Sequence, residues 1–335
     1  MTPSTRSAVA RRMALVAGLA FGAFAGVGAH AQAQAQAWPT KTIKMIAPST
    51  PGGPPDVYAR ALADLMSRDL GQPIVVENSP AVGGMVAAQQ MLRAPADGYT
   101  LMVSTAGMLT ITPNANPKAK YTPADFTPIC QGVDAGLVLA SHPSLGPRDF
   151  KGLQQWLKAE KTPPTYSSYS PGSPAHFLGF QLSEALNVPM THVPYRSSPQ
   201  QITDMVGGIA PLGFVQIATA TPQIKAGKLL AFATTAPTRA PELPDVPTVR
   251  ELGLPQLETT VWFGLNGPPG LPAPIVKRLT DAHRKVLASP EFRSRMALSG
   301  LAPSPDICGD AFLKKMNDES ARWARIVKAT GFVAD

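Results

Sequence analysis

The stretch that decides the fold reads Thr42-Ile43-Lys44-Met45-Ile46-Ala47-Pro48-Ser49-Thr50-Pro51-Gly52-Gly53-Pro54-Pro55-Asp56. Its first six residues are typical of a strand, and the glycine turn leads into an amphipathic helix over residues 56–70. Such a turn brings bare backbone N–H groups to the positive end of a helix, where anions bind. The segment therefore predicts an anion-binding loop, although Gly52 and Gly53 could also serve only to make a tight turn.

The chain begins with the features of a removable export signal. Arg6, Arg11 and Arg12 precede an apolar run rich in alanine and glycine, and Ala29-His30-Ala31 fits the cleavage rule. The apolar run is short and poor in Leu and Ile, which favours a cleaved signal over a retained membrane anchor. We expect Sec-type export to remove residues 1–31 and to leave a monomeric protein in the periplasm. The Ala-Gln repeat that follows leaves the exact cleavage site open.

Composition argues against several classes of function. Without its first 31 residues the 335-residue chain retains 304, enough for two domains with full cores. Three of the 30 basic residues lie in the signal, so 27 basic residues remain against 22 acidic ones, a net charge of +5. Only 16% of residues are charged and no Lys/Arg block occurs, which argues against nucleic-acid binding. The five histidines are scattered, and we expect no metal and no cofactor.

Two cysteines, Cys130 and Cys308, remain after removal of the signal. An oxidising compartment permits a disulfide between them, and their even number is compatible with one. Two buried free thiols are the alternative. The spacing of the two cysteines does not decide between these possibilities.

Short apolar strands alternate with amphipathic helices along the exported chain. We expect strands at residues 42–47, 73–77, 99–103, 137–140, 165–168, 192–195, 212–215, 229–233 and 261–265, and a mostly helical tail over 274–330. Strands separated by helices of this length predict parallel βαβ units. A proline-rich stretch over residues 236–247 interrupts the pattern. The sequence therefore predicts two α/β lobes, one of residues 38–136 with 256–335 and the other of residues 137–255.

Four turns rich in Gly, Ser or Thr follow predicted strands. They comprise residues 51–53, 104–107, 168–173 and 195–198. Open parallel sheets bind ligands beyond the carboxyl ends of their strands, and small residues there allow close approach of the backbone. The convergence of these turns predicts a small-molecule site.

A series of short motifs follows in order from Trp38 to Phe332. They are Trp38-Pro39, Pro51-Gly52-Gly53 with Asp56, Leu70-Gly71-Gln72-Pro73, Val76-Glu77-Asn78, Gly83-Gly84, Asp97-Gly98-Tyr99-Thr100-Leu101, His192-Val193-Pro194-Tyr195, Gly207-Gly208, Ile224-Lys225-Ala226-Gly227-Lys228-Leu229 and Leu243-Pro244-Asp245-Val246-Pro247-Thr248. Each motif is weak alone, but their order spans nearly the whole chain. With these residues the chain resembles the Bug family, periplasmic solute receptors that include the binding component of tripartite tricarboxylate transporters.

The resemblance implies an α/β, two-lobed type II periplasmic-binding-protein fold with a ligand cleft between the lobes. It places the contacts to a carboxylated ligand in two facing loops, which correspond to residues 51–56 and 168–176. It implies a small organic carboxylate as ligand, either a di- or tricarboxylate or an aromatic acid. The implied partners are the large and small membrane subunits of a transporter. A periplasmic sensor module for a two-component kinase would share the same cleft, and this alternative stays open.

The candidate ligand-binding residues come from these loops and from the other strand ends. They are Pro51, Gly52, Gly53, Asp56, Ser104, Thr105, Ser168, Gly172, Ser173, His176, Tyr195 and Arg196. Several have a purely structural alternative: Asp56 could cap its helix, His176 could be a satisfied buried histidine, Arg196 could be solvated, and the hydroxyls could only form turns.

A secreted hydrolase is the rival class of protein. It would need a nucleophile with a base within reach, and the sequence lacks the G-x-S-x-G pattern of a nucleophile elbow. No pair of carboxylates stands out either. We therefore expect a binding protein with no catalytic residues, not an enzyme.

Overall fold

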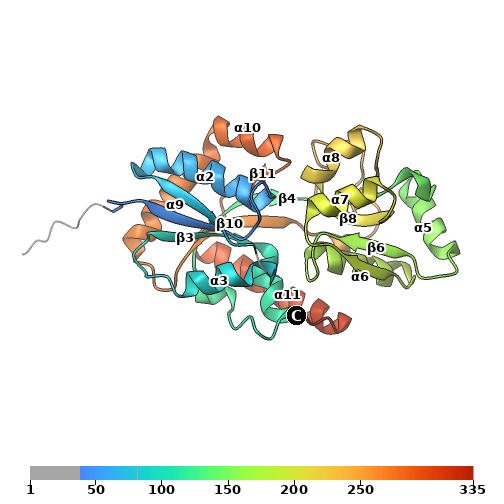
Figure 1. Cartoon of the computed structure of the whole chain (residues 1–335), viewed down its shortest axis with the longest axis horizontal. Coiled ribbons are helices and arrows are strands. Elements are labelled where there is room, and N and C mark those ends of the chain that lie inside the picture. Colours follow the sequence, from blue (N-terminus) through green and yellow to red (C-terminus); the bar gives the residue numbers. More distant parts are fainter. Residues whose placement is uncertain (1–37, 81, 335) are drawn as a thin grey trace, which may run out of the picture. The chain divides into compact units, whose positions relative to one another are not determined.

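Two separate β-sheets organise residues 38–80 and 82–334, which are the residues that the computed structural model describes (Figure 1). The predicted signal peptide, residues 1–31, lies outside the described residues. None of the described helices combines the length and the apolar character needed to cross a membrane.

The first sheet has six strands in the order β11-β4-β10-β3-β1-β2. Their bounds are Ile43–Ala47 (β1), Ile74–Asn78 (β2), Thr100–Thr105 (β3), Thr127–Ala135 (β4), Val261–Gly267 (β10) and Ala302–Pro303 (β11). β1 pairs in parallel with both β2 and β3, as the alternation of strands and helices predicts. β10 runs antiparallel to β3 and β4, and β11 runs antiparallel to β4.

Helices cover both faces of this sheet (Figure 1). Their bounds are Pro54–Leu70 (α2), Met85–Leu92 (α3), Thr112–Ala115 (α4), Ala273–Ala288 (α9), Pro290–Leu298 (α10) and Asp310–Thr330 (α11). Neighbouring residues of β10 show the alternation of a strand: Trp262 packs on Phe312 of α11, whereas the ring of Phe263 lies 6.3 Å from Tyr58 of α2. The two faces therefore have separate apolar cores.

The second sheet has five strands in the order β7-β6-β8-β5-β9. Their bounds are Leu137–Ser141 (β5), Thr165–Ser168 (β6), Thr191–Pro194 (β7), Leu212–Gln216 (β8) and Leu230–Thr234 (β9). β6 is parallel to β7 and β8, whereas β5 is antiparallel to β8 and β9. The helices of this half are Phe150–Ala159 (α5), Pro174–Leu186 (α6), Ser198–Val206 (α7) and Ile217–Lys225 (α8).

The structure corrects the expected strand pattern in two respects. First, β5 is antiparallel to β8 and β9, and β10 is antiparallel to β3 and β4. Each of these two strands enters its sheet from the other sheet, β5 one residue after β4 and β10 after residues 235–260, and not through a helical crossover of the βαβ type. Second, β4 was not expected, although its nine residues lie next to β10 in the sheet. Pro128, Gln131 and Asp134 interrupt its apolar alternation, which explains why the sequence pattern did not reveal it.

The chain crosses between the two sheets in two segments that lie close together, one from β4 to β5 and the other from β9 to β10. The N–H of Leu137 donates to Thr235 Oγ1 at 3.1 Å, and Thr235 Oγ1 donates to Thr259 O at 2.8 Å. The N–H of Thr259 returns to Thr235 O at 2.9 Å. Thr235 thus joins the passage from β4 to β5 with the passage from β9 to β10. The lobe boundaries near residues 136 and 256 stay a prediction, which this division of the strands supports.

Cys130 and Cys308 form a disulfide, which answers the question that their spacing left open. Cys130 lies in β4, and Cys308 precedes α11 by two residues. The N–H of Gln131 donates to Ile307 O at 2.9 Å beside the bridge, and the N–H of Gly309 donates to Ile129 O at 3.0 Å. The bridge and these bonds attach the start of α11 to the six-stranded sheet.

Candidate functional site

The first predicted ligand loop, residues 51–56, comprises the end of the connection between β1 and α2 and the first residues of α2. Gly52 has φ +78°, a left-handed conformation that favours glycine, whereas Gly53 has an ordinary φ of −70°. The N–H of Gly52 donates to Asp56 Oδ2 at 2.8 Å, and the N–H of Gly53 donates to Thr50 O at 3.1 Å. Pro51 is exposed, and the two prolines that begin α2 have no N–H to offer. The amides of both glycines, which we expected to bind an anion, are therefore engaged inside the loop.

Asp56 is the centre of a buried network that fixes this loop. The residue is 2% exposed; Oδ2 accepts from Gly52 N–H and from Arg60 Nε at 3.0 Å, and Oδ1 accepts from Asn78 Nδ2 at 2.8 Å. Burial alone would raise the pKa of the Asp56 carboxyl, but the hydrogen bonds from Arg60, Gly52 and Asn78 together bring it below its usual value. Asp56 therefore holds the loop in shape through Gly52, although no side chain caps the first residue of α2 as we had expected of Asp56.

Ser49 is a residue that the sequence analysis did not single out. Its hydroxyl is buried and has no hydrogen-bond partner among the described residues. A Cβ added to Gly53 would lie 3.6 Å from this hydroxyl, so the turn brings the two residues together. The carbonyl of Ser49 is held by Asn78 Nδ2 at 3.0 Å. The Ser49 hydroxyl is therefore a donor that the loop itself does not use, and its place between a strand end and a glycine turn is the signal that could have revealed it.

The two candidates at the end of β3 have structural partners. Ser104 donates to Asn266 Oδ1 of β10 at 2.6 Å, and both residues are fully buried. Thr105 Oγ1 accepts from the N–H of Met108, in the π-helical turn of residues Gly107–Ile111, at 3.2 Å. Asn266 Nδ2 is buried without a hydrogen-bond partner among the described residues. The hydroxyl of Ser104 thus links β3 to β10, and that of Thr105 links β3 to the π-helical turn. The unpaired amide of Asn266 is another group that sequence reasoning missed.

The second predicted ligand loop, residues 168–176, comprises the turn of residues 168–173 between β6 and α6 and the first residues of α6. Its hydroxyls converge on one carbonyl, since Ser170 O accepts from Ser168 Oγ at 3.0 Å and from Ser173 Oγ at 2.6 Å. Gly172 has φ +67°, and its N–H donates to His176 Nδ1 at 3.2 Å. Ser173 also caps α6, because its side chain accepts from the N–H of His176. The small residues of this loop therefore hold its own turn, as those of the first loop do.

Two stacked histidines support the second loop. The rings of His176 and His192 lie 3.8 Å apart at 10°, and His192 Nε2 lies 2.7 Å from Ser168 Oγ. Burial lowers the pKa of His176 to about 4; burial, together with the neighbouring His176, lowers that of His192 to about 3. Both rings are therefore neutral at pH 7. Because His176 Nδ1 accepts from Gly172, its proton is on Nε2, which leaves one N–H donor and no positive charge.

The remaining candidates, Tyr195 and Arg196, follow β7. Tyr195 is buried in an apolar cluster with Ile202 and Met205, and burial and the nearby carboxylate of Asp204 raise its pKa to about 12. Its N–H donates to Ser168 O at 2.8 Å, so its backbone supports the second loop. Arg196 is exposed and forms no ion pair within the part of the chain that the structure describes. Arg196 is thus the one cation among the candidates, and Tyr195 has a structural role.

The candidates form two groups, one at each sheet. The loops after β1 and β3 lie side by side because these strands are paired, and the same holds for the loops after β6 and β7. A surface cavity of about 480 Å³ lies elsewhere, lined by residues of α6, α11 and the segment 255–258. Among the described residues, no three His, Cys, Asp or Glu side chains come together as a metal ion would require.

Comparison with known proteins identifies the family. Residues 58–332 match the model of the tripartite tricarboxylate transporter family receptor. The chain belongs to this family. The resemblance to Bug proteins is confirmed by the structure of the periplasmic binding protein BugD, which is 32% identical, has a TM-score of 0.79, and covers 89% of this chain and 100% of its own. The two-lobed periplasmic-binding-protein fold is therefore confirmed as well.

Two further receptor structures are similar and contain dicarboxylates. MatC from Rhodopseudomonas palustris with bound malate is 30% identical, with a TM-score of 0.77 over 87% of this chain and 100% of its own. Rpa4515 of R. palustris with adipate is 28% identical, with a TM-score of 0.81 over 88% of this chain and 99% of its own. Two proteins similar to this chain over most of its length therefore hold small dicarboxylates.

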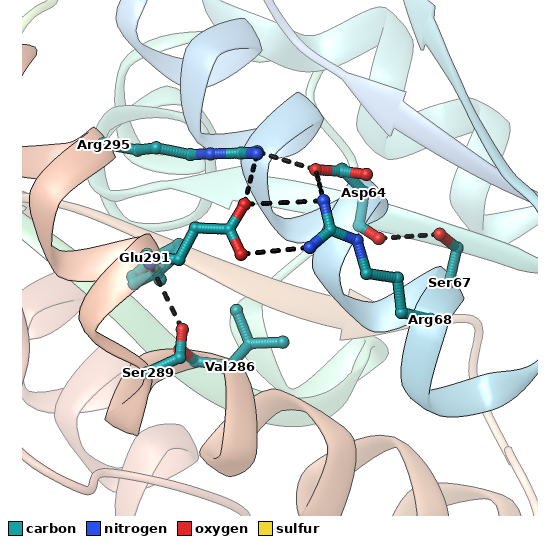
Figure 2. Close-up of polar contacts among 8 residues, drawn as sticks. Asp64, Ser67, Arg68, Val286, Ser289, Glu291 and Arg295 are labelled. Carbon is teal, nitrogen blue, oxygen red and sulfur yellow. Dashed lines mark hydrogen bonds and ion pairs between the residues drawn. The ribbon is translucent and has the colours of Figure 1, made fainter.

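We predict that replacing Asp56 with asparagine destabilises this receptor by about 1–3 kcal/mol, because a buried network loses its charge and Gly52 or Arg60 loses an acceptor. Asp64 provides the matched control on the same helix. Figure 2 shows it in an exposed network with Arg68, Arg295 and Glu291. Asp64→Asn should cost only about 0–1 kcal/mol, since surface ion pairs contribute little. Urea unfolding measures both, and equal losses would contradict the anchoring role of Asp56.

The histidine stack predicts a pH dependence of stability. Unfolded histidines bind protons near their ordinary pKa of 6.5, whereas His176 and His192 stay neutral down to about pH 4 and 3 in the folded receptor. The unfolded state therefore binds more protons below about pH 6.5, and the free energy of unfolding falls as the pH falls from 7 to 4.

The variant His192→Gln should reduce this slope by up to about 1.4 kcal/mol per pH unit, which corresponds to one proton. The control is His142→Asn, where His142 accepts from the N–H of Ser144 in a turn outside the stack. Other buried groups such as His283 titrate equally in all three proteins and cancel in the comparison. Unfolding curves from pH 4 to 7 provide the measurement, and a wild-type slope in His192→Gln would disprove the assignment.

Proposed function

We propose that this receptor captures a small organic dicarboxylate between its two lobes in the periplasm, after export removes residues 1–31, and presents it to the membrane subunits of a tripartite tricarboxylate transporter. The observation that carries this proposal is the similarity, over 87–88% of the chain, to two receptor structures that hold malate and adipate. The ligand class and the transporter are inferences from these relatives. A periplasmic sensor module could use the same ligand site. The two functions would differ only in the partner protein, a sensor kinase in place of the transporter.

The strand-end loops support this assignment chemically. Both loops are built around small residues and are held by internal hydrogen bonds, so they need little reordering when a ligand arrives. Among the described residues, the donors that the loops do not use internally include the Ser49 hydroxyl, which lies just before the first loop, and the Nε2–H of His176 in the second. Arg196 adds an exposed positive charge beside the second loop. Such a set suits a carboxylate that is bound by hydrogen bonds and one peripheral cation.

We further propose that the lobes are residues 38–136 with 256–335 and residues 137–255, and that the ligand brings them together. The division of strands between the two sheets supports these boundaries. The linked segments at Leu137, Thr235 and Thr259 would then be the hinge. Small-angle X-ray scattering tests the closure, because a saturating dicarboxylate should decrease the radius of gyration of the purified receptor.

The test of ligand binding is a thermal-shift screen of the purified exported protein with malate, adipate and aromatic acids. A ligand that binds only the folded state raises the unfolding temperature. Calorimetry on Gly53→Val then locates the site. This valine needs no unusual φ, but it places methyl groups beside the Ser49 hydroxyl, and we expect the affinity for the best acid to fall about tenfold or more, or 1.4 kcal/mol.

Gly207→Val is the matched control, since Gly207 ends α7 at a similar φ of −77° and is exposed. This variant should bind the acid with wild-type affinity. Equal affinity in Gly53→Val would move the site away from the first loop. Binding of none of the acids would refute the proposed ligand class, and chemical conversion of the acid by the wild-type protein would restore the hydrolase interpretation.

A further inference from the structure

The C-terminal tail turns back after α11 and is fixed at both ends. Gly331 ends the helix in a left-handed conformation with φ +64°, which redirects the chain. The N–H of Phe332 donates to Thr330 Oγ1 at 3.2 Å, and the N–H of Ala334 donates to Ala115 O at 2.7 Å. Ala115 ends α4, so the tail is attached to the half of the chain that contains β1 and β3.

Phe332 contacts the other half of the chain. Its ring lies edge-on to His176 at 4.8 Å and 83°, and edge-on to Phe177 of α6 at 5.7 Å. A Cβ added to Gly172 would lie only 3.2 Å from Cε1 of Phe332. The ring therefore lies directly against the two residues whose hydrogen bond, Gly172 N–H to His176 Nδ1, closes the turn of the second loop.

The rest of the tail does not share this contact. Val333, the next residue, is 64% exposed, whereas Phe332 is half-buried against a cluster that contains Ile111, Phe177 and Trp323. In this cluster α4 and α11, from the half with the six-stranded sheet, pack against α6, from the half with the five-stranded sheet. Within the tail, Phe332 is thus the aromatic side chain that links the two halves.

From these contacts we infer that Phe332 is a positioning residue for the second loop. It acts through His176: the ring confines one edge of the imidazole while His192 stacks on it, and His192 in turn bonds Ser168 at the start of the loop. One apolar side chain from the C-terminus thereby restrains both ends of residues 168–173. Its effect on the loop is independent of any ligand, and its effect on affinity rests on the proposed function.

Hydrogen exchange in the ligand-free protein tests this role. In Phe332→Ala the Gly172 amide should exchange about tenfold faster or more, because its acceptor loses the packing that holds it. Amides of the first loop, such as Gly52, should exchange at the wild-type rate, which separates a local effect from general destabilisation. Val333→Ala is the matched control and should leave the Gly172 amide unchanged. Phe332→Leu retains apolar volume and should partly restore protection.

An unchanged Gly172 rate in Phe332→Ala would overturn the inference, as would equal acceleration of Gly172 and Gly52. If Phe332→Ala does not fold, Phe332→Leu decides, and a wild-type Gly172 rate there refutes the role. Calorimetry with malate and adipate gives the second readout: affinity should fall in Phe332→Ala and not in Val333→Ala. If the wild type binds neither acid, the proposed ligand is wrong, and the exchange rates still decide whether Phe332 positions the loop.

Discussion

The buried carboxylate of Asp56 is the constraint on which the architecture of the first predicted ligand loop depends. A loop at the end of a strand has backbone groups with no partner in the sheet, and each must find one if the loop is to keep a single shape. The Asp56 carboxylate accepts hydrogen bonds from Gly52 in the loop, from Asn78 in β2 and from Arg60 in its own helix. Because three elements meet at one carboxylate, the strand, the turn and the helix are fixed relative to one another by a group that water does not reach.

The second loop meets the same requirement with neutral groups. His176 accepts the Gly172 amide, His192 stacks on His176, and the serines of the loop share the carbonyl of Ser170. A neutral imidazole is an effective acceptor here, since a protonated one would lose the lone pair that Gly172 uses. Burial keeps both rings neutral at physiological pH. The two loops are thus preorganised by different chemistry. A charged carboxylate holds the first loop, and two histidines kept neutral by burial hold the second.

Whether a feature of this structure could be predicted from the sequence depends on how far apart its interacting residues lie along the chain. The sequence predicted the strand, turn and helix around Gly52, and the turn after β6, because these depend on residues a few positions apart. It could not settle the disulfide between Cys130 and Cys308, which are separated by 178 positions. It did not reveal β4, the stacking of His192 on His176, or the contact of Phe332, because none has a local pattern. The family motifs included Asn78 and His192, but their partners became known only from the fold.

The internal use of so many donors bears on how such a receptor would select its ligand. Gly52 and Gly53 were candidates for their backbone N–H groups, and Ser104, Ser168 and Ser173 for their hydroxyls. Each of these donors has a partner within the protein. Among the described residues, the groups left over include the hydroxyl of Ser49, the amide Nδ2 of Asn266, the Nε2–H of His176 and the exposed Arg196. No buried cation lies among the candidates to attract every anion alike. Selection by such a site would depend on where a ligand's oxygens meet those few donors, and hence on the length and shape of the acid. Rigid loops favour this kind of selection, because a loop that cannot rearrange cannot adapt to an acid of the wrong length.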